Sequence, residues 1–332
     1  MSINAISRPR TFLITGATDG IGKHTSQRLA SDGSHALLVH GRKSLSDAGI
    51  KSLIKDLNSL GAANVAYFQA DLSNLKEVES LAEQVIAQLQ SWQSIQSSDS
   101  SPIPSLDVLI NNAGVYDPEP RYSSQGFDAT MAINVLAPFV LTRKLLPSLI
   151  RGDDVRVITT SSISQSRTLP DLDSLFSRRL QDGKYYGNVE PLPYSAHSFY
   201  SYSKLGDFLF TAKLAKLLSS YQLDSGNDAS IPQTLIDNMR RIQCLTMDPG
   251  TVNTKMLLAG WGPCGIPVKK ANNTYKLASL EEYSFGRVDS GSYHFGGGGS
   301  SDANDEEKLN KFWNTLVDCT GTRYDDLSSD CF

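Results

Sequence analysis

The sequence is poor in cysteine, lacks a long apolar run, and has no apolar segment at its N-terminus. No run of 18 apolar residues is present, so we expect no membrane-spanning helix, and MSINAISRPR does not resemble a secretory signal. The few cysteines are too scattered for a disulfide scaffold or a CxxC zinc site: Cys244, Cys264, Cys319 and Cys331. We therefore expect free thiols, no metal site and a cytoplasmic protein.

An excess of positive charge is also missing. Lys and Arg number 31 against 35 Asp and Glu, which gives a net charge of −4 and argues against a nucleic-acid partner. The apolar residues make up 40% of the chain, a value ordinary for a globular protein. The length of 332 residues fits one enlarged α/β domain.

Short β-branched runs alternate along the chain with longer helical patterns. Strands are predicted at Thr11–Thr15, His35–His40, Asn64–Phe68, Leu106–Ile110 and Val155–Thr160. Helices are predicted at Gly20–Ser31, Ser44–Leu60 and Asn74 to about Gln90, with another long helix before the last strand. This alternation predicts an α/β fold with a doubly wound parallel sheet, the Rossmann fold.

Three irregular stretches, 91–105, 164–199 and 261–300, interrupt this rhythm. We interpret them as insertions in a single dinucleotide-binding domain over residues 9–320, followed by a tail at 321–332. Ligands of such sheets bind beyond the carboxyl ends of the strands. We therefore expect the second and third insertions to form a wall or lid over the substrate.

A glycine-rich turn, TGATDGIG, joins the first predicted strand to the first helix. Gly16, Gly20 and Gly22 have the spacing G-x-x-x-G-x-G. Such glycines let the backbone approach a pyrophosphate, and the first-turn N–H groups bind it. For the glycines alone, an ordinary turn is an equal alternative.

The second strand ends in HGRK, without the acidic residue that usually meets a free ribose 2′-hydroxyl. Arg42 and Lys43 follow Gly41, and a guanidinium can hold a 2′-phosphate, so NADP is favoured over NAD. The alternative is that Arg42 begins a solvated helix face.

Asp71, before Leu72, is placed either to accept from an adenine amino group or to cap a helix.

Side chains suited to acid–base chemistry follow later strands. Tyr200 and Lys204 are four residues apart and lie on one face of a helix. A phenol has a pKa of about 10, which a neighbouring ammonium lowers, so the pair is a tunable general acid/base. Ser162 ends the fifth strand and could donate to a carbonyl oxygen, and Asn134 lies within a helix where asparagine is a weak former. Each has a plain alternative: a surface pair, a turn serine or a satisfied buried amide.

These motifs, with NNAG at Asn111 to Gly114 and DPGTVNT at Asp248 to Thr254, resemble the short-chain dehydrogenase/reductase superfamily in its single-domain form. YSKLGDFLFTAKLAKLL and SGSYHF resemble its retinol dehydrogenase-like and WW-domain oxidoreductase-like branch. Two departures stand out. Residue 248 is Asp where His is common, and Tyr200 follows Ser162 by 38 residues rather than the shorter spacing of simple members.

The resemblance implies an NADP-dependent oxidoreductase that acts on a small or lipophilic alcohol, aldehyde or ketone, with homo-oligomers as a common state. It implies Tyr200 as proton donor or acceptor, Lys204 as its partner on the nicotinamide ribose, Ser162 orienting the carbonyl and Asn134 holding a water. Residues implied in cofactor binding are Gly16, Thr18, Asp19, Gly20, Ile21, Gly22, Arg42, Lys43, Asp71, Leu72, Asn112, Ala113, Gly114, Tyr200, Lys204, Pro249, Gly250, Val252 and Thr254. The alternative function is a catalytically inactive NADP-binding regulator on the same fold.

Overall fold

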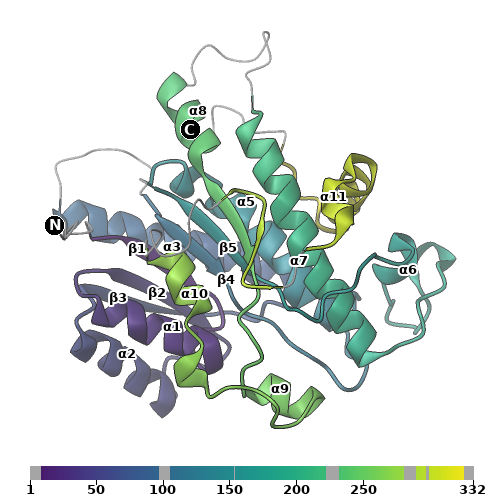
Figure 1. Ribbon diagram of the computed structural model, residues 1–332, viewed down its shortest axis with the longest axis horizontal. Helices are drawn as coiled ribbons and strands as arrows, with labels where there is room; N and C mark the ends of the chain where they lie inside the picture. The colour runs from purple at the N-terminus through teal and green to yellow at the C-terminus, as the bar shows by residue number, and fades with distance from the viewer. Residues whose placement is uncertain are drawn as a thin grey trace.

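A seven-stranded parallel sheet forms the centre of the molecule (Figure 1). The computed structural model describes residues 9–96, 105–152, 154–221, 232–279, 289–296 and 299–324. The strand order is β3-β2-β1-β4-β5-β6-β7, and every neighbouring pair is parallel. The strands are β1 (Thr11–Ile14), β2 (Ala36–Gly41), β3 (Asn64–Gln69), β4 (Val108–Asn111), β5 (Arg156–Thr160), β6 (Gln243–Met247) and β7 (Tyr293–His294). The predicted doubly wound fold is confirmed.

Helices cover both faces of this sheet. One face carries α1 (Gly20–Ser31), α2 (Ala48–Leu60) and α10 (Asn273–Ala278). The other carries α3 (Leu75–Gln96), α5 (Ala137–Leu149) and α7 (Ala196–Ser219), with α11 (Glu306–Thr320) packed outside α7 (Figure 1). Shorter helices lie at the rim: α4 (Ala129–Met131), α6 (Leu172–Leu175), α8 (Gln233–Arg241) and α9 (Lys255–Gly260).

Alternation along the strands builds a separate core on each face. In β1, Leu13 joins the core under α3, α5 and α7, whereas Phe12 and Ile14 join the core under α1 and α10. All three are fully buried. This is the pattern expected when a parallel sheet is covered on both sides, because successive side chains point to opposite faces.

The predicted strands and helices are present, with shifted boundaries. Helix α3 continues to Gln96, into the stretch expected to be a loop; the rest of that stretch, 97–104, lies outside the described residues. The stretch 164–199 contains α6 and a short 3-10 turn at Tyr186–Asn188, and α7 begins at Ala196 within it. Strands β6 and β7 were not among the predicted strands.

One helical stretch of the described residues, Ala129–Leu149, is long and apolar enough to cross a membrane. However, 89% of its most apolar window is buried inside the protein. It comprises α4, a π-helical turn and α5, which pack against α3 and α7. This stretch therefore has the place of a core helix in the fold.

Cys244, Cys264 and Cys319 are free thiols, and Cys331 lies outside the described residues. Within the described part of the chain, no three His, Cys, Asp or Glu side chains gather into a group that could hold a metal ion.

Candidate active site

A cavity of about 530 Å³ opens at the carboxyl ends of the central strands. It is lined by the glycine-rich turn, the ends of β2 to β5, α7 and the segment after β6. All residues predicted for catalysis or cofactor binding line it except Lys43 and Asn134. The fold therefore brings together side chains that are up to 238 positions apart, from Gly16 to Thr254.

The glycine-rich turn is packed too closely for side chains at two of its glycines. A Cβ on Gly22 would lie 2.4 Å from the Gly16 carbonyl oxygen, and one on Gly16 would lie 2.9 Å from Ala113 Cα. Gly16 also has φ of +64°, which favours glycine. Asn112 Nδ2 donates to the carbonyl oxygen of Thr15 at 2.8 Å and so ties the turn to β4. Asn112 thus supports the turn.

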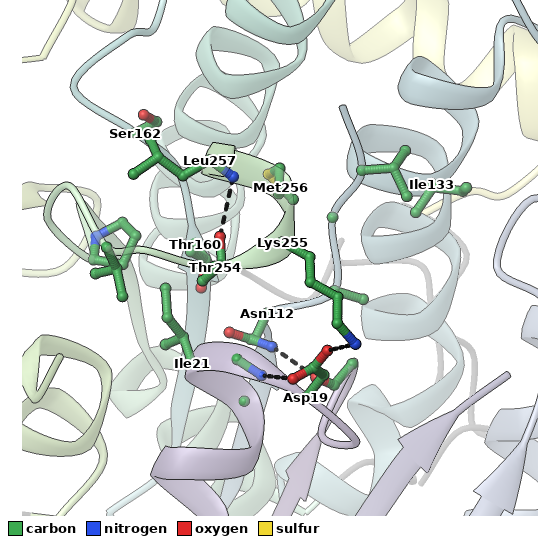
Figure 2. Close-up of a pocket in the computed structure, with 18 of the residues that line it drawn as sticks. Asp19, Ile21, Asn112, Ile133, Thr160, Ser162, Thr254, Lys255, Met256 and Leu257 are labelled. Carbon is green, nitrogen blue, oxygen red and sulfur yellow. Dashed lines mark hydrogen bonds and ion pairs between the residues drawn. The ribbon is translucent and has the colours of Figure 1, made fainter. Parts of the chain in front are cut away.

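Helix α1 begins at this turn and points its first N–H groups toward the cavity. Asp19 caps the helix by accepting from the N–H of Gly20 at 2.8 Å. The carboxylate also pairs with Lys255 Nζ at 2.5 Å, across the cavity mouth (Figure 2). This pair lowers the pKa of Asp19. N–H groups of the first turn have no acceptor within the helix, so they are available to a phosphate.

His40, which the sequence analysis missed, holds the turn from the β2 side. The N–H of Gly16 donates to His40 Nδ1 at 3.2 Å, and His40 Nε2 lies 3.1 Å from the carbonyl oxygen of Ala70. This pattern fits a neutral ring protonated on Nε2. Burial lowers the pKa of His40 from 6.5 to about 4. The neutral histidine, itself in β2, therefore connects the segments that follow β1 and β3 by hydrogen bonds.

The residues after β2 differ in their placement. Arg42 is exposed and lines the cavity, while Lys43 lies outside the lining and pairs with Asp47 at 3.1 Å. A Cβ on Gly41 would lie 2.3 Å from Thr18 Cγ2, so no acidic side chain fits there without movement. The structure thus presents one cation, Arg42, at the edge expected to meet a ribose.

Asp71 and Leu72 line the cavity after β3. Asp71 Oδ1 accepts from the N–H of Ser73 at 2.9 Å, so the carboxylate closes a local turn rather than capping α3 directly. The N–H of Asp71 donates to Glu77 at 2.7 Å. Leu72 is buried and gives this side of the cavity an apolar surface.

Asn134 lies in a π-helical turn, Ala132–Leu136, between α4 and α5. Its side chain accepts from the N–H of Val115 at 2.8 Å and donates to the Val115 carbonyl at 3.0 Å and to Ser203 Oγ at 2.9 Å. Through these hydrogen bonds the buried Asn134 amide holds the segment after β4 in place. π-Helical turns are rare and are often found at functional sites.

Tyr200 and Lys204 meet Ser162 at the centre of the cavity wall. Lys204 Nζ lies 5.6 Å from the centroid of the Tyr200 ring and donates to the Thr160 carbonyl at 2.8 Å. Ser162 Oγ lies 2.9 Å from Ser164 Oγ, and it also interacts with the Tyr200 phenol. Helix α7 and the end of β5 thus present a phenol, an ammonium and a hydroxyl to one space.

Opposing effects act on the Tyr200 phenol. Burial raises its pKa, whereas the Lys204 ammonium and the Ser162 hydroxyl lower it. The net direction is upward. The lysine acts in the predicted direction, but removal of the phenol from water is the larger effect.

The segment after β6 closes the opposite wall. Asp248 is buried and accepts from the N–H of Gly250 at 2.9 Å, which shapes the turn that exposes Pro249. Thr254 caps α9 by accepting from the N–H of Leu257 at 3.2 Å (Figure 2). Val252, which also lines the cavity, is buried.

Two rings that the sequence analysis did not single out, Tyr116 and Trp261, pack against the Tyr200 ring, and a third, His197, packs against both of them. The centroid of Tyr116 lies 5.9 Å from that of Tyr200, and the centroid of Trp261 lies 5.5 Å away. His197 Nδ1 is 3.1 Å from Tyr116 Oη. The signal was weak because these residues come from separate parts of the chain: Tyr116 follows β4, His197 lies in the first turn of α7, and Trp261 follows α9.

The residues present fit an NAD(P) dinucleotide. The close backbone packing at Gly16 and Gly22 and the first turn of α1 form a cradle for a pyrophosphate. A Cβ on Gly114 would lie 3.5 Å from Lys204 Nζ, so this glycine keeps the space beside the ammonium open. Residues from the glycine-rich turn would hold the phosphates, and Tyr200 and Lys204 would face the nicotinamide end.

Comparisons with known proteins agree with this geometry. The family model for short chain dehydrogenase matches residues 10–172. Dehydrogenase/reductase SDR family member FEY of Arabidopsis thaliana is 31% identical over 63% of this chain and 50% of its own length. Retinol dehydrogenase 12 of Bos taurus is 30% identical over 63% of this chain and 57% of its own. The chain therefore spans little more than half the length of these relatives.

The fold also matches a solved structure over nearly its whole length. An uncharacterized protein from Mycobacterium paratuberculosis aligns with a TM-score of 0.66 and 24% identity, covering 98% of this chain and 99% of that one. This similarity bears on the fold alone. The predicted superfamily is confirmed, and retinol dehydrogenases are among its relatives here, as expected. The chain belongs to the short-chain dehydrogenase/reductase superfamily.

Proposed function

We propose that this protein is an NADP-dependent oxidoreductase that interconverts an alcohol with an aldehyde or ketone. The observation that carries the proposal is that Ser162, Tyr200 and Lys204 line the same cavity as the glycine-rich turn. The superfamily uses NAD(P), and a bound nicotinamide supplies or accepts the hydride.

The chain's own groups supply proton transfer and orientation. Tyr200 donates a proton to the carbonyl oxygen in reduction and accepts it from the alcohol in oxidation. Lys204 stabilises the phenolate by its charge. Ser162 donates a hydrogen bond to the substrate oxygen, where negative charge develops.

The preference for NADP rests on the end of β2. Arg42 is the cation that lines the cavity there, and a Cβ on Gly41 would lie 2.3 Å from Thr18 Cγ2, so an acidic side chain at this position would require Thr18 to move. A guanidinium can make paired hydrogen bonds to a 2′-phosphate.

The substrate proposal rests on the walls near Tyr200. Met256, Leu257 and Trp261 line the cavity on one side, and Val115 and Ile163 on another. These apolar surfaces favour a lipophilic carbonyl compound or alcohol, because a polar one would lose water there without a partner.

A panel of aldehydes, ketones and alcohols tests the proposal, with absorbance of NADPH as the readout. We expect turnover of at least one lipophilic member, with a higher kcat/KM for NADPH than for NADH. Tight NADPH binding without turnover of any member would instead support the inactive, NADP-binding regulator.

A further inference from the structure

Helix α7 places a third ionisable side chain on the face that carries Tyr200 and Lys204. Asp207 lies three residues after Lys204 and seven after Tyr200, so all three share one stripe of the helix. The Asp207 Oδ2 atom lies 2.8 Å from Lys204 Nζ. Asp207 does not line the cavity, so any effect on the reaction must pass through the lysine.

The pair is removed from water. The side chains of Lys204 and Asp207 are 4% and 2% exposed. Burial of an ion pair costs solvation free energy, which is recovered only with close geometry and further hydrogen bonds. Asp207 Oδ1 has no hydrogen-bond partner within the described residues. The carboxylate therefore directs its one short contact to Lys204.

This contact orients the ammonium. A lysine ammonium has three N–H donors. One is used by the Thr160 carbonyl and one by Asp207, both at 2.8 Å. The third remains for the space beside Tyr200, where Gly114 leaves room. Without Asp207, the ammonium would be fixed at one point and free to rotate.

The carboxylate also offsets part of the positive charge that Tyr200 experiences. Lys204 lowers the pKa of Tyr200, and Asp207 raises it. Burial lowers the pKa of Lys204, but the nearby Asp207 carboxylate and Tyr200 raise it, and the net direction is upward. Burial raises the pKa of Asp207 itself to about 7, although Lys204 acts in the opposite direction. Above that pH the Asp207 carboxylate keeps the lysine charged and moderates its effect on the phenol.

We propose that Asp207 is a positioning residue, which fixes Lys204 Nζ and sets the pH range in which the Tyr200–Lys204 pair works. This inference rests on the proposed oxidoreductase function. It adds a carboxylate to the predicted set of Asn134, Ser162, Tyr200 and Lys204.

Other titratable groups face the same region and stay in place in the test. Asp248 acts on Tyr200 from the segment after β6, and Tyr293 of β7 lies near Asp207 and Tyr200. The rings of Tyr116 and His197 belong to the cluster around Tyr200. Their contributions to a pH profile are common to the wild type and the Asp207 variant.

The test is the pH profile of kcat/KM for alcohol oxidation in Asp207→Asn, which removes the charge and keeps the shape. Without the carboxylate, Tyr200 experiences more of the lysine charge, so we expect the acidic limb to move about one pH unit lower. Lys204 loses its counter-ion in a buried place, so the alkaline limb should also move lower. An unchanged pair of limbs would overturn the proposal, whatever the change in kcat.

Asp302→Asn is the matched control. Asp302 is also largely buried, with a side chain 8% exposed, and it pairs with Lys308 at 2.6 Å outside the cavity lining. We expect its limbs to stay at the wild-type positions. A shift of equal size in this variant would contradict a specific role for Asp207.

A second variant keeps the test possible if Asp207→Asn folds poorly. Asp207→Ser removes the carboxylate with a smaller side chain, and the same shifts are expected. Loss of folded protein in both, judged by thermal melting, would assign Asp207 to stability alone and overturn the proposal.

Tyr200→Phe distinguishes failure of the proposed oxidoreductase function from failure of the role proposed for Asp207. If it retains turnover, the proposed function fails; if it is inactive while the Asp207 profiles stay unchanged, only this inference fails.

Discussion

Gly22→Ala tests whether the glycine-rich turn needs its close backbone packing. The added Cβ would lie 2.4 Å from the Gly16 carbonyl oxygen and 2.5 Å from Asn112 Nδ2. The Gly16 oxygen belongs to the backbone, and Asn112 Nδ2 is held by its hydrogen bond to Thr15, so the turn itself must move by about 1 Å to restore ordinary contact, which begins near 3.5 Å. The displaced Asn112 would also lose its 2.8 Å bond to Thr15.

The expected cost combines two effects. Overpacking costs about 1–3 kcal/mol and the lost hydrogen bond about 1 kcal/mol, so the free energy of unfolding should fall by roughly 2–4 kcal/mol. Because the turn forms the phosphate cradle, NADPH affinity should fall by more than about tenfold, which corresponds to 1.4 kcal/mol.

Thermal melting and fluorescence titration with NADPH measure the two effects. Gly49→Ala is the control, because its Cβ would meet only the Asp47 side chain, at 3.0 Å, on the exposed side of α2. We expect the control to bind NADPH as the wild type does. Wild-type affinity and stability in Gly22→Ala would refute the packing argument.

Two further predictions concern the neighbouring strand ends. Arg42→Asp should lower the ratio of kcat/KM for NADPH over NADH by roughly ten- to a hundredfold, since a charge-assisted hydrogen bond contributes about 1.5–3 kcal/mol; an unchanged ratio would exclude Arg42 as the phosphate contact. His40 has a folded pKa of about 4, below its ordinary 6.5, so the unfolded chain binds more protons between these values. The stability that the neutral ring contributes is complete above pH 6.5 and is lost as the pH falls toward 4, by up to about 3 kcal/mol. Urea unfolding from pH 7 to 4 should show a shallower decline in His40→Gln, and parallel declines would contradict this role.

The sequence was sufficient for the fold because its periodicity is strong. Helix α1 was predicted at Gly20–Ser31, where it is found. The strands β1 to β5 are buried runs flanked by turns, which a single sequence reveals. By contrast, β7 has only two residues, and each of them pairs with a residue of β6 that lies 47 positions earlier in the chain, as Tyr293 does with Thr246. No local pattern marks so short a strand.

Site residues could be predicted from the sequence where reactive side chains occur at a characteristic spacing within one short motif. Tyr200 and Lys204 stand out by their spacing, and they meet as expected. Asp207 was missed although it is a lone acid in the apolar run LGDFLF, because a charge on a helix is usually solvated and only the packing shows its burial. His40 and Trp261 were missed because their partners come from distant segments, which only the tertiary structure brings together.

The most direct test of the central claim is the kcat/KM of Tyr200→Phe with NADPH and an active carbonyl substrate, beside Tyr202→Phe as the control. Tyr202 lies on the same helix, outside the cavity lining. We predict that Tyr200→Phe binds NADPH with wild-type affinity but has lost at least about a hundredfold in turnover, as expected for removal of a general acid. Tyr202→Phe should stay active. Substantial turnover by Tyr200→Phe would contradict the assignment of Tyr200 as the proton donor.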